Sequence, residues 1–421
     1  MNEISALQAT ANTKEKISSN AIWAGLISLF LIASTSSEYR LRLAGLLVHP
    51  YLIAIPVAII VAKIKVFDIP SSSLRWLLAF YVFFSVANLP NDNPLSEAFK
   101  LGGTVATFLF FAQAIKTEKD FEIVSYGFII CAIYVAYKAV MMSGSGSRLA
   151  GINALEGLGN KNAQSLYTLP GLFLASIALL RNYERRNILQ MTILGGGIFI
   201  LMIGLVLSAN RSGWVGALVV FGFMVIRMGV SFRTILIGGV FVVMGYFAVM
   251  NFAADIVEHK MNKTTEGYGS DNKRVDLIVE SLRIGIEHPF FGVGLDKLRI
   301  QLAERLETGE GHVDPHNVYG FLLGAGGIFT FFLFFLFLSS LMFPVKLTSY
   351  TKYFAEDYKK ARVLMVGIIV LFLIRAVFTR EILYNPNFIG SIGLLYSYLL
   401  FYSKKMNDEQ YNYYLNQSQE V

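Results

Sequence analysis

Long apolar runs separated by short charged segments recur along the whole chain. A helix needs about 20 residues to cross the ~30 Å hydrocarbon core of a bilayer. Such segments must be helical, because unpaired backbone groups cannot face lipid and no run alternates as membrane strands do. We expect about twelve spanning helices, at 20–36, 43–62, 75–90, 101–115, 121–142, 164–180, 188–207, 213–230, 234–255, 318–343, 362–378 and 388–403.

The composition supports this class and excludes a soluble globule. Hydrophobic residues make up 55% of the 421 positions, charged residues only 15%, and the mean hydropathy is +0.54. A single cysteine, Cys131, leaves no disulfide framework or cysteine-rich metal site. The polar first twenty residues lack a cleavage signal, so we expect the first helix to be retained. The prediction is an all-α integral membrane protein.

Positive charges recur in alternate loops, which indicates the orientation. If the N-terminus is cytoplasmic, the loops on that side carry Lys63, Lys65, Lys116, Lys119, Arg181, Arg185, Arg186, Arg227, Arg233, Lys346, Lys352, Lys359, Lys360, Arg362, Lys404 and Lys405. This is the positive-inside pattern, and an even helix count returns the C-terminus to the cytoplasm. Lipid-facing loops thus account for the net charge of +7 without nucleic acid as a partner.

One long external loop, 256–317, is too polar to span a membrane. Within it, Asp271 to His288 predicts an amphipathic helix with Val275, Ile278, Leu282 and Ile286 on one face, and Asp296 to Leu306 predicts a second short helix. The expected organisation is helices in 1–255, the external helical loop in 256–317, helices in 318–403 and a cytoplasmic tail in 404–421.

His316 and Asn317 open the apolar run at 318–343. An imidazole at the external end of a spanning helix can exchange protons with water while the helix holds its backbone, which suits a general base. A structural role as a helix cap is the alternative. Gly320, Gly324 and Gly327 follow at helical spacing, which also fits close helix packing.

Several external charges are candidates for binding an anion. Arg211 follows the helix at 188–207, and Arg274 opens the loop helix; lipid headgroups and bulk solvent are their simpler partners. Arg375, Arg380 and Glu381 lie near the external end of the helix at 362–378, and could pair with one another. Further polar residues precede the helix at 164–180, including Arg148 and the segment 160–162. We find no nucleotide-binding glycine motif and no spacing suited to a metal.

The sequence resembles the bacterial O-antigen ligases and the related O-antigen and exopolysaccharide polymerases. The resemblance rests on His316-Asn317, nine residues, Gly327, two residues and Thr330, and extends over most of the chain. The turn at 289–294, Pro-Phe-Phe-Gly-Val-Gly, resembles the family's loop turn, and Arg211 and Arg274 resemble its external arginines. Val215 departs from the leucine of many members.

The resemblance implies a GT-C-like glycosyltransferase of the bacterial inner membrane with its site facing the periplasm. It would transfer a glycan from undecaprenyl diphosphate to a sugar hydroxyl, with inversion and without metal or cofactor. His316 would be the base, and Arg211 and Arg274 would bind the diphosphate. Asn317, Arg148, Arg380 and Glu381 would support the site.

The acceptor distinguishes the two activities of this family. A ligase, which we favour, would use the lipid A-core, and a polymerase would use another lipid-linked glycan. A transporter of lipid-linked sugars and a non-enzymatic scaffold remain as other classes; a transporter predicts binding charges near the membrane midplane, and a scaffold needs no convergence of the three candidate residues.

Overall fold

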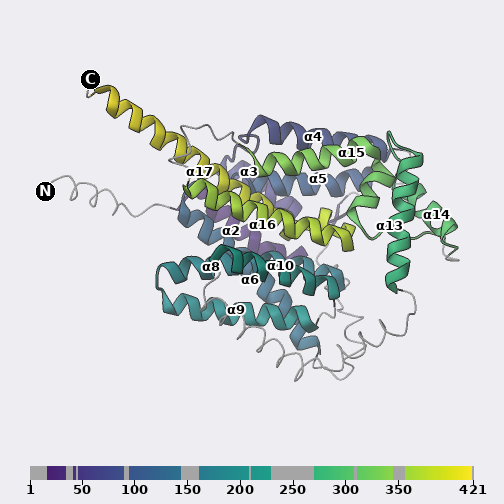
Figure 1. Ribbon diagram of the computed structural model, residues 1–421, viewed down its shortest axis with the longest axis horizontal. Helices are drawn as coiled ribbons and strands as arrows, with labels where there is room; N and C mark the ends of the chain where they lie inside the picture. Colours follow the sequence, from purple (N-terminus) through teal and green to yellow (C-terminus); the bar gives the residue numbers. More distant parts are fainter. Residues whose placement is uncertain are drawn as a thin grey trace.

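The computed structural model describes residues 17–34, 41–43, 46–89, 94–143, 161–207, 210–228, 270–307, 311–344 and 356–419. The described chain is almost entirely helical, as expected (Figure 1). Its α-helices are α2 (Ser19–Phe30), α3 (Tyr51–Ala62), α4 (Ser71–Ala87), α5 (Pro94–Phe111), α6 (Glu118–Ser143), α8 (Lys161–Glu184), α9 (Ile188–Leu207), α10 (Arg211–Met228), α13 (Ser270–Glu287), α14 (Leu295–Arg305), α15 (Val318–Met342), α16 (Glu356–Phe378) and α17 (Pro386–Gln419). Two 3-10 helices, η1 (Leu31–Ser34) and η3 (Arg380–Tyr384), accompany them.

Four described helices are long and apolar enough to cross a membrane: Glu118–Met141, Ile188–Val206, Val318–Met342 and Glu356–Phe378. Four shorter apolar helices are Ser19–Phe30, Tyr51–Ala62, Ser71–Ala87 and Ser212–Phe223. The expected helix at 234–255 lies outside the described residues. The multi-pass architecture is thus supported, whereas twelve spans and cytoplasmic termini stay predictions.

The expected continuous helix at 43–62 is wrong in its first eight residues. Two short strands, β1 (Leu41–Leu43) and β2 (Leu46–Val48), form an antiparallel hairpin there, and α3 begins only at Tyr51. Pro50 explains the boundary, because a residue before proline is disfavoured in the helical conformation while proline itself is tolerated at a helix start.

Small residues let the bundle helices approach one another closely. A Cβ added to Gly127 would lie 2.9 Å from the Gly25 carbonyl, where α2 meets α6, and one on Gly171 would lie 2.1 Å from Ala132 Cβ, where α6 meets α8. This is the small-residue packing that membrane helices use. Between α4 and α15 the core is aromatic, with the rings of Phe84 and Phe321 5.4 Å apart.

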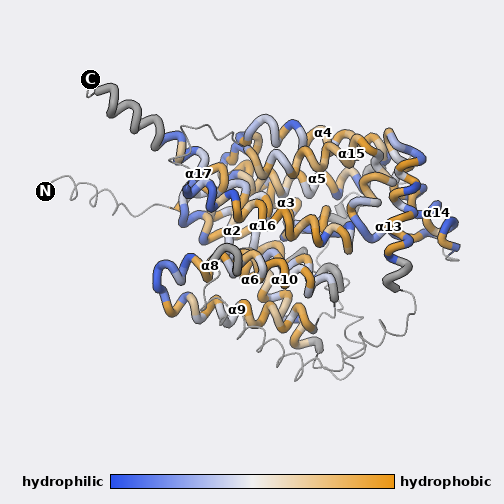
Figure 2. Tube along the Cα trace, in the orientation of Figure 1, coloured by the Kyte–Doolittle hydropathy of each residue, from blue (hydrophilic) through white to orange (hydrophobic). Residues whose placement is uncertain are grey.

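The polar ends of the bundle are separated by an apolar middle. Figure 2 shows hydrophilic residues at the end where α8 joins α9 and at the opposite end, around α13 and α14, with hydrophobic segments between them. The helix α13 runs across the ends of the bundle helices (Figure 1). The two helices expected in the external loop are therefore present as α13 and α14, and they cap one end of the bundle.

The buried face of α13 differs in part from the expected apolar face. Val275 and Ile286 are exposed and Ile278 and Leu282 are half-buried, whereas Leu277, Ser281 and Ile284 are buried where α13 packs on α15. Small residues select this face: a Cβ on Gly320 of α15 would lie 2.6 Å from Ser281 Cβ. Close backbone approach at these small residues and burial of Leu277 and Ile284 together define the contact surface.

Candidate active site

Asn317 caps the N-terminus of α15. Its Oδ1 accepts a hydrogen bond from the Gly320 amide at 2.6 Å, and its Nδ2 donates to the Pro315 carbonyl at 2.8 Å. Asparagine is a favoured N-cap because its side chain satisfies an amide that has no partner within the helix. The capping role weighed for the His-Asn pair thus belongs to Asn317.

His316 lies immediately before this cap in the left-handed backbone region, with φ at 52°. Non-glycine residues are uncommon there and carry a strain of about 1–3 kcal/mol, which surrounding contacts must hold. The side chain is exposed although protein surrounds much of its ring. The cap and the strained backbone together fix the start of α15 and leave the imidazole accessible.

Asp314 ties the segment 311–317 to two other elements. Its Oδ1 is 2.6 Å from Arg380 Nε, and its Oδ2 accepts hydrogen bonds from Arg380 Nη2 at 2.8 Å and from Arg299 Nη2 at 3.2 Å. Burial alone would raise the pKa of Asp314, but the two guanidinium groups outweigh it and hold the pKa below its usual value. Since Arg299 belongs to α14 and Arg380 to η3, the cluster holds His316 between the cap helices and the end of α16.

The charges around His316 come from separate parts of the chain. Partial burial lowers the pKa of His316, Asp314 and Glu381 oppose that lowering, and Arg274 and Arg380 add to it. The net result is a pKa below the usual value, so the neutral imidazole that can accept a proton predominates at neutral pH. Arg274, an exposed residue of α13, is therefore within electrostatic range of His316.

The glycine-rich turn after α13 docks into a break in α15. Gly327 interrupts the helix with φ 74° and ψ −178°. Across the break, Val293 donates to the Gly324 carbonyl at 2.9 Å, Gly294 donates to the Ala325 carbonyl at 3.1 Å, and Ile328 donates to the Pro289 carbonyl at 2.6 Å. Backbone hydrogen bonds thus join the turn at 289–294 to the His316–Thr330 motif. Gly327 interrupts α15 so that the turn can dock, which is a different role from close packing of an unbroken helix.

Arg375 is buried where α16 meets α8 and α10. It is fully shielded from solvent, donates to Ser165 Oγ at 2.9 Å and also hydrogen-bonds to Ser212 Oγ. Asn210 Nδ2 donates to the same Ser165 Oγ at 3.0 Å. These contacts fix the start of α10, whose first residue is Arg211; the side chain of Arg211 lies outside the described residues.

The mutual pairing considered for Arg375, Arg380 and Glu381 does not describe the main contacts of the two arginines. Arg380 instead pairs with Asp314, and Arg375 bonds to serines, with Glu381 within electrostatic range of Arg375 and of His316. The chain leaves the helical conformation at Thr379, between the end of α16 and the start of η3, so the two arginines face different neighbours. Asp314 was missed as a member of the site; only its proximity to His316 in sequence pointed to it.

Most of the expected site residues with described side chains lie around His316. Asn317, Arg380, Glu381 and Arg274 are brought together around His316 as described above. Arg148 lies outside the described residues. Within the described ranges, no group of three or more His, Cys, Asp or Glu side chains is arranged to hold a metal ion.

A protein-family model described as O-Antigen ligase matches residues 196–335. This segment, about a third of the chain, is similar to the O-antigen ligase family. The matched segment includes Arg211, Arg274, His316, Gly327 and Thr330. No curated protein matches the chain.

The match over residues 196–335 supports the O-antigen ligase and polymerase family as the general class of the protein. It indicates a glycosyltransferase-like membrane enzyme that acts on lipid-linked glycans. With the apolar helices, it also indicates a multi-pass protein of the bacterial inner membrane. Arg375, Arg380 and Glu381 follow the matched segment in the chain, so the charged cluster extends beyond the O-antigen ligase domain.

Proposed function

We propose that this protein is an O-antigen ligase. It transfers a glycan from undecaprenyl diphosphate to a sugar hydroxyl of the lipid A-core on the periplasmic side of the inner membrane. The observation that carries the proposal is the surroundings of His316: an accessible imidazole with a lowered pKa, two arginines and two carboxylates, at the opening of a membrane-length helix.

His316 acts as the general base. A neutral imidazole removes the proton from the acceptor hydroxyl as its oxygen attacks the anomeric carbon of the donor glycan. The bond to the diphosphate breaks in the same displacement, so the anomeric configuration is inverted. The lowered pKa supports this role because the base is in its proton-accepting form at neutral pH.

Arg274 and Arg211 stabilise the leaving diphosphate. Guanidinium groups match phosphate oxygens in bidentate geometry, and negative charge develops on the diphosphate as the glycosidic bond breaks. Arg274 is supported by its electrostatic interaction with His316. Arg211 is supported by its place at the first position of α10, where a helix N-terminus favours an anion. This chemistry requires no metal.

A polymerase is the alternative within the same family, and it differs in the acceptor. A transporter would place its binding charges near the membrane midplane, whereas His316 precedes α15 and Arg380 follows α16. That placement favours chemistry at one membrane surface.

Purified protein in proteoliposomes tests the proposal. With a lipid-linked oligosaccharide as donor, transfer to lipid A-core is expected, whereas transfer to a second lipid-linked glycan would identify a polymerase. His316→Ala should lower transfer by roughly 10²–10⁴-fold, the usual contribution of a general base. His312→Ala, an exposed histidine four residues earlier, is the matched control and should retain activity. Undiminished transfer by the His316 variant would overturn the mechanism.

A further inference from the structure

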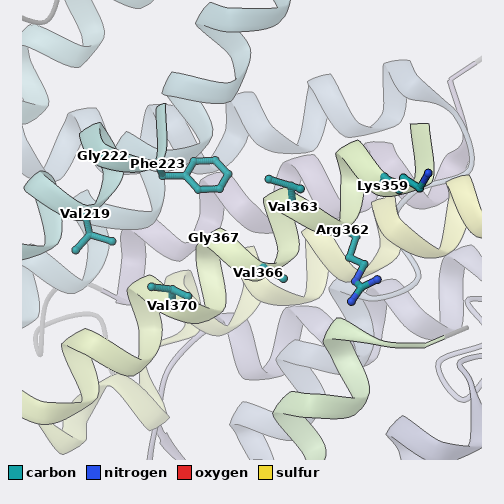
Figure 3. Close-up of a pocket in the computed structure, with 9 residues that line it drawn as sticks. All are labelled: Val219, Gly222, Phe223, Lys359, Arg362, Val363, Val366, Gly367 and Val370. Atoms are coloured by element: carbon teal, nitrogen blue, oxygen red, sulfur yellow. The ribbon is translucent and has the colours of Figure 1, made fainter. Parts of the chain in front are cut away.

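A groove lies between α10 and α16, far from His316 along the bundle. Its cavity volume is about 600 Å³, and Figure 3 shows side chains of both helices around it. The lining is formed by Val219, Gly222, Phe223, Lys359, Arg362, Val363, Val366, Gly367 and Val370. It is thus apolar along most of its length and carries two cations.

Both cations lie toward one end of the groove, with side chains that extend in different directions, and Val219 and Val370 lie toward the other end (Figure 3). Lys359 is exposed, and the Arg362 guanidinium carbon stands 4.2 Å from the ring centroid of Phe343. Within the part of the chain that the structure describes, no carboxylate lies within ion-pair distance of either cation. Glu356, in the preceding turn, pairs with Lys360, whose Nζ is 2.9 Å from a Glu356 oxygen, and lies within electrostatic range of Lys359.

The extent of the groove along α16 places it in one leaflet of the bilayer. From Lys359 to Val370 the helix rises about 16 Å, close to half of the ~30 Å hydrocarbon core. All of α16, Glu356–Phe378, spans about 34 Å at the same rise per residue. The cations therefore mark one membrane surface, the apolar part reaches the midplane, and Arg375 lies about 24 Å from Lys359 toward the other surface.

We propose that this groove binds one anionic glycerophospholipid of the leaflet opposite the candidate active site. Lys359 and Arg362 contact the phosphate, and one acyl chain lies along the valine-lined surface of α16. The charge of the groove favours an anionic occupant. Two cations with no carboxylate of the described residues at ion-pair distance attract a lipid of net negative charge, and basic pockets between membrane helices bind such headgroups. The bound lipid bridges α10 and α16, and thereby supports the helix junction that Arg375 completes farther along.

Native mass spectrometry of the full chain, released from detergent with equal amounts of phosphatidylglycerol and phosphatidylcholine, tests the proposal. One phosphatidylglycerol should remain bound in preference. The double variant Lys359→Gln and Arg362→Gln should reduce its retention by at least about tenfold, since two phosphate contacts are lost. Lys65→Gln, which removes an exposed cation outside the groove, is the matched control and should retain the lipid. Soluble glycerol 3-phosphate should not displace it.

A second variant blocks the groove without removing charge. A Cβ built on Gly222 has no heavy atom of the described chain within 4 Å, so Gly222→Leu extends into open space. We expect it to fold and to lose phosphatidylglycerol to a similar extent. Equal retention of both lipids, or undiminished retention by either groove variant, would overturn the proposal. Absence of bound lipid in the unaltered protein would also overturn it and would point to another part of the chain, or a second copy, as the occupant.

Discussion

Arg380 and Asp314 form an ion pair that connects the end of α16 to the segment bearing His316. The two residues are 66 positions apart, and Arg380 Nε stands 2.6 Å from Asp314 Oδ1. The Arg380 guanidinium also lies 5.1 Å from the ring centroid of Phe321, in the first turn and a half of α15. The Arg380 guanidinium therefore contacts Asp314, which precedes His316 in the chain, and Phe321, which follows it in α15.

Replacement of Asp314 by asparagine should loosen this connection. Loss of a partly buried ion pair leaves Arg380 without its carboxylate, and we expect the free energy of unfolding to fall by about 1–3 kcal/mol. Glycan transfer should decrease with it, because His316 loses its support. Thermal unfolding in detergent and the transfer rate are the measurements. Asp276→Asn, at an exposed position of α13, is the control; equal effects of both substitutions would contradict the role of the pair.

The pH dependence of transfer should shift in opposite directions when charges of opposite sign are removed near His316. Arg274 lowers the pKa of His316 and Glu381 raises it. Arg274→Gln should therefore move the rising limb of the pH–rate profile to higher pH, and Glu381→Gln should move it to lower pH. In the unaltered enzyme the rate should rise through the lowered pKa and then level off, as deprotonated imidazole accumulates.

The imidazole resonance of His316, assigned by its loss in His316→Ala, gives the same pKa independently of turnover. This second readout separates an electrostatic effect from a loss of donor binding in the Arg274 variant. Shifts of the same sign in both variants would contradict the arrangement of charges around His316.

Gly327→Ala should disrupt the docking of the turn on α15. A Cβ there would lie 2.3 Å from the Phe290 carbonyl oxygen, and the backbone φ of 74° is unfavourable for alanine. We expect a loss of about 2 kcal/mol or more in unfolding free energy, measured by chemical or thermal denaturation. Gly311→Ala is the control because its added Cβ has no described neighbour within 4 Å. A stable, fully active Gly327 variant would show that the turn does not require this break.

Arg375 and Ser212 should be energetically coupled. Arg375→Met and Ser212→Ala each remove one partner of a buried hydrogen bond, so the double variant should lose less stability than the sum of the single losses. We expect a coupling of about 1 kcal/mol or more, as for hydrogen bonds to charged groups. Ser176→Ala is the control, because Ser176 bonds to the Leu172 carbonyl in its own helix; its effect should add to that of Arg375→Met. A non-zero coupling with Ser176 would indicate a general loosening of the bundle.

Features that depend on nearby residues were predictable from the sequence. The membrane class, most helix positions and the two helices of the external loop follow from apolar periodicity and from proline and glycine stops, which act within a few residues. The placement of Asn317 at a helix start was predictable for the same reason. The prediction of a continuous helix at 43–62 failed because it ignored the effect of Pro50 on the preceding residue.

The sequence by itself determined that this chain crosses a membrane, that it carries O-antigen ligase family motifs, and that His316 stands at the opening of a spanning helix. Only the tertiary structure decided that Asp314 pairs with Arg380, that Arg375 is buried against Ser165 and that α13 packs through its small residues. These contacts join residues as many as 210 positions apart. Periodicity shows which residues share a face, but the partner of that face is set by how closely whole helices can approach.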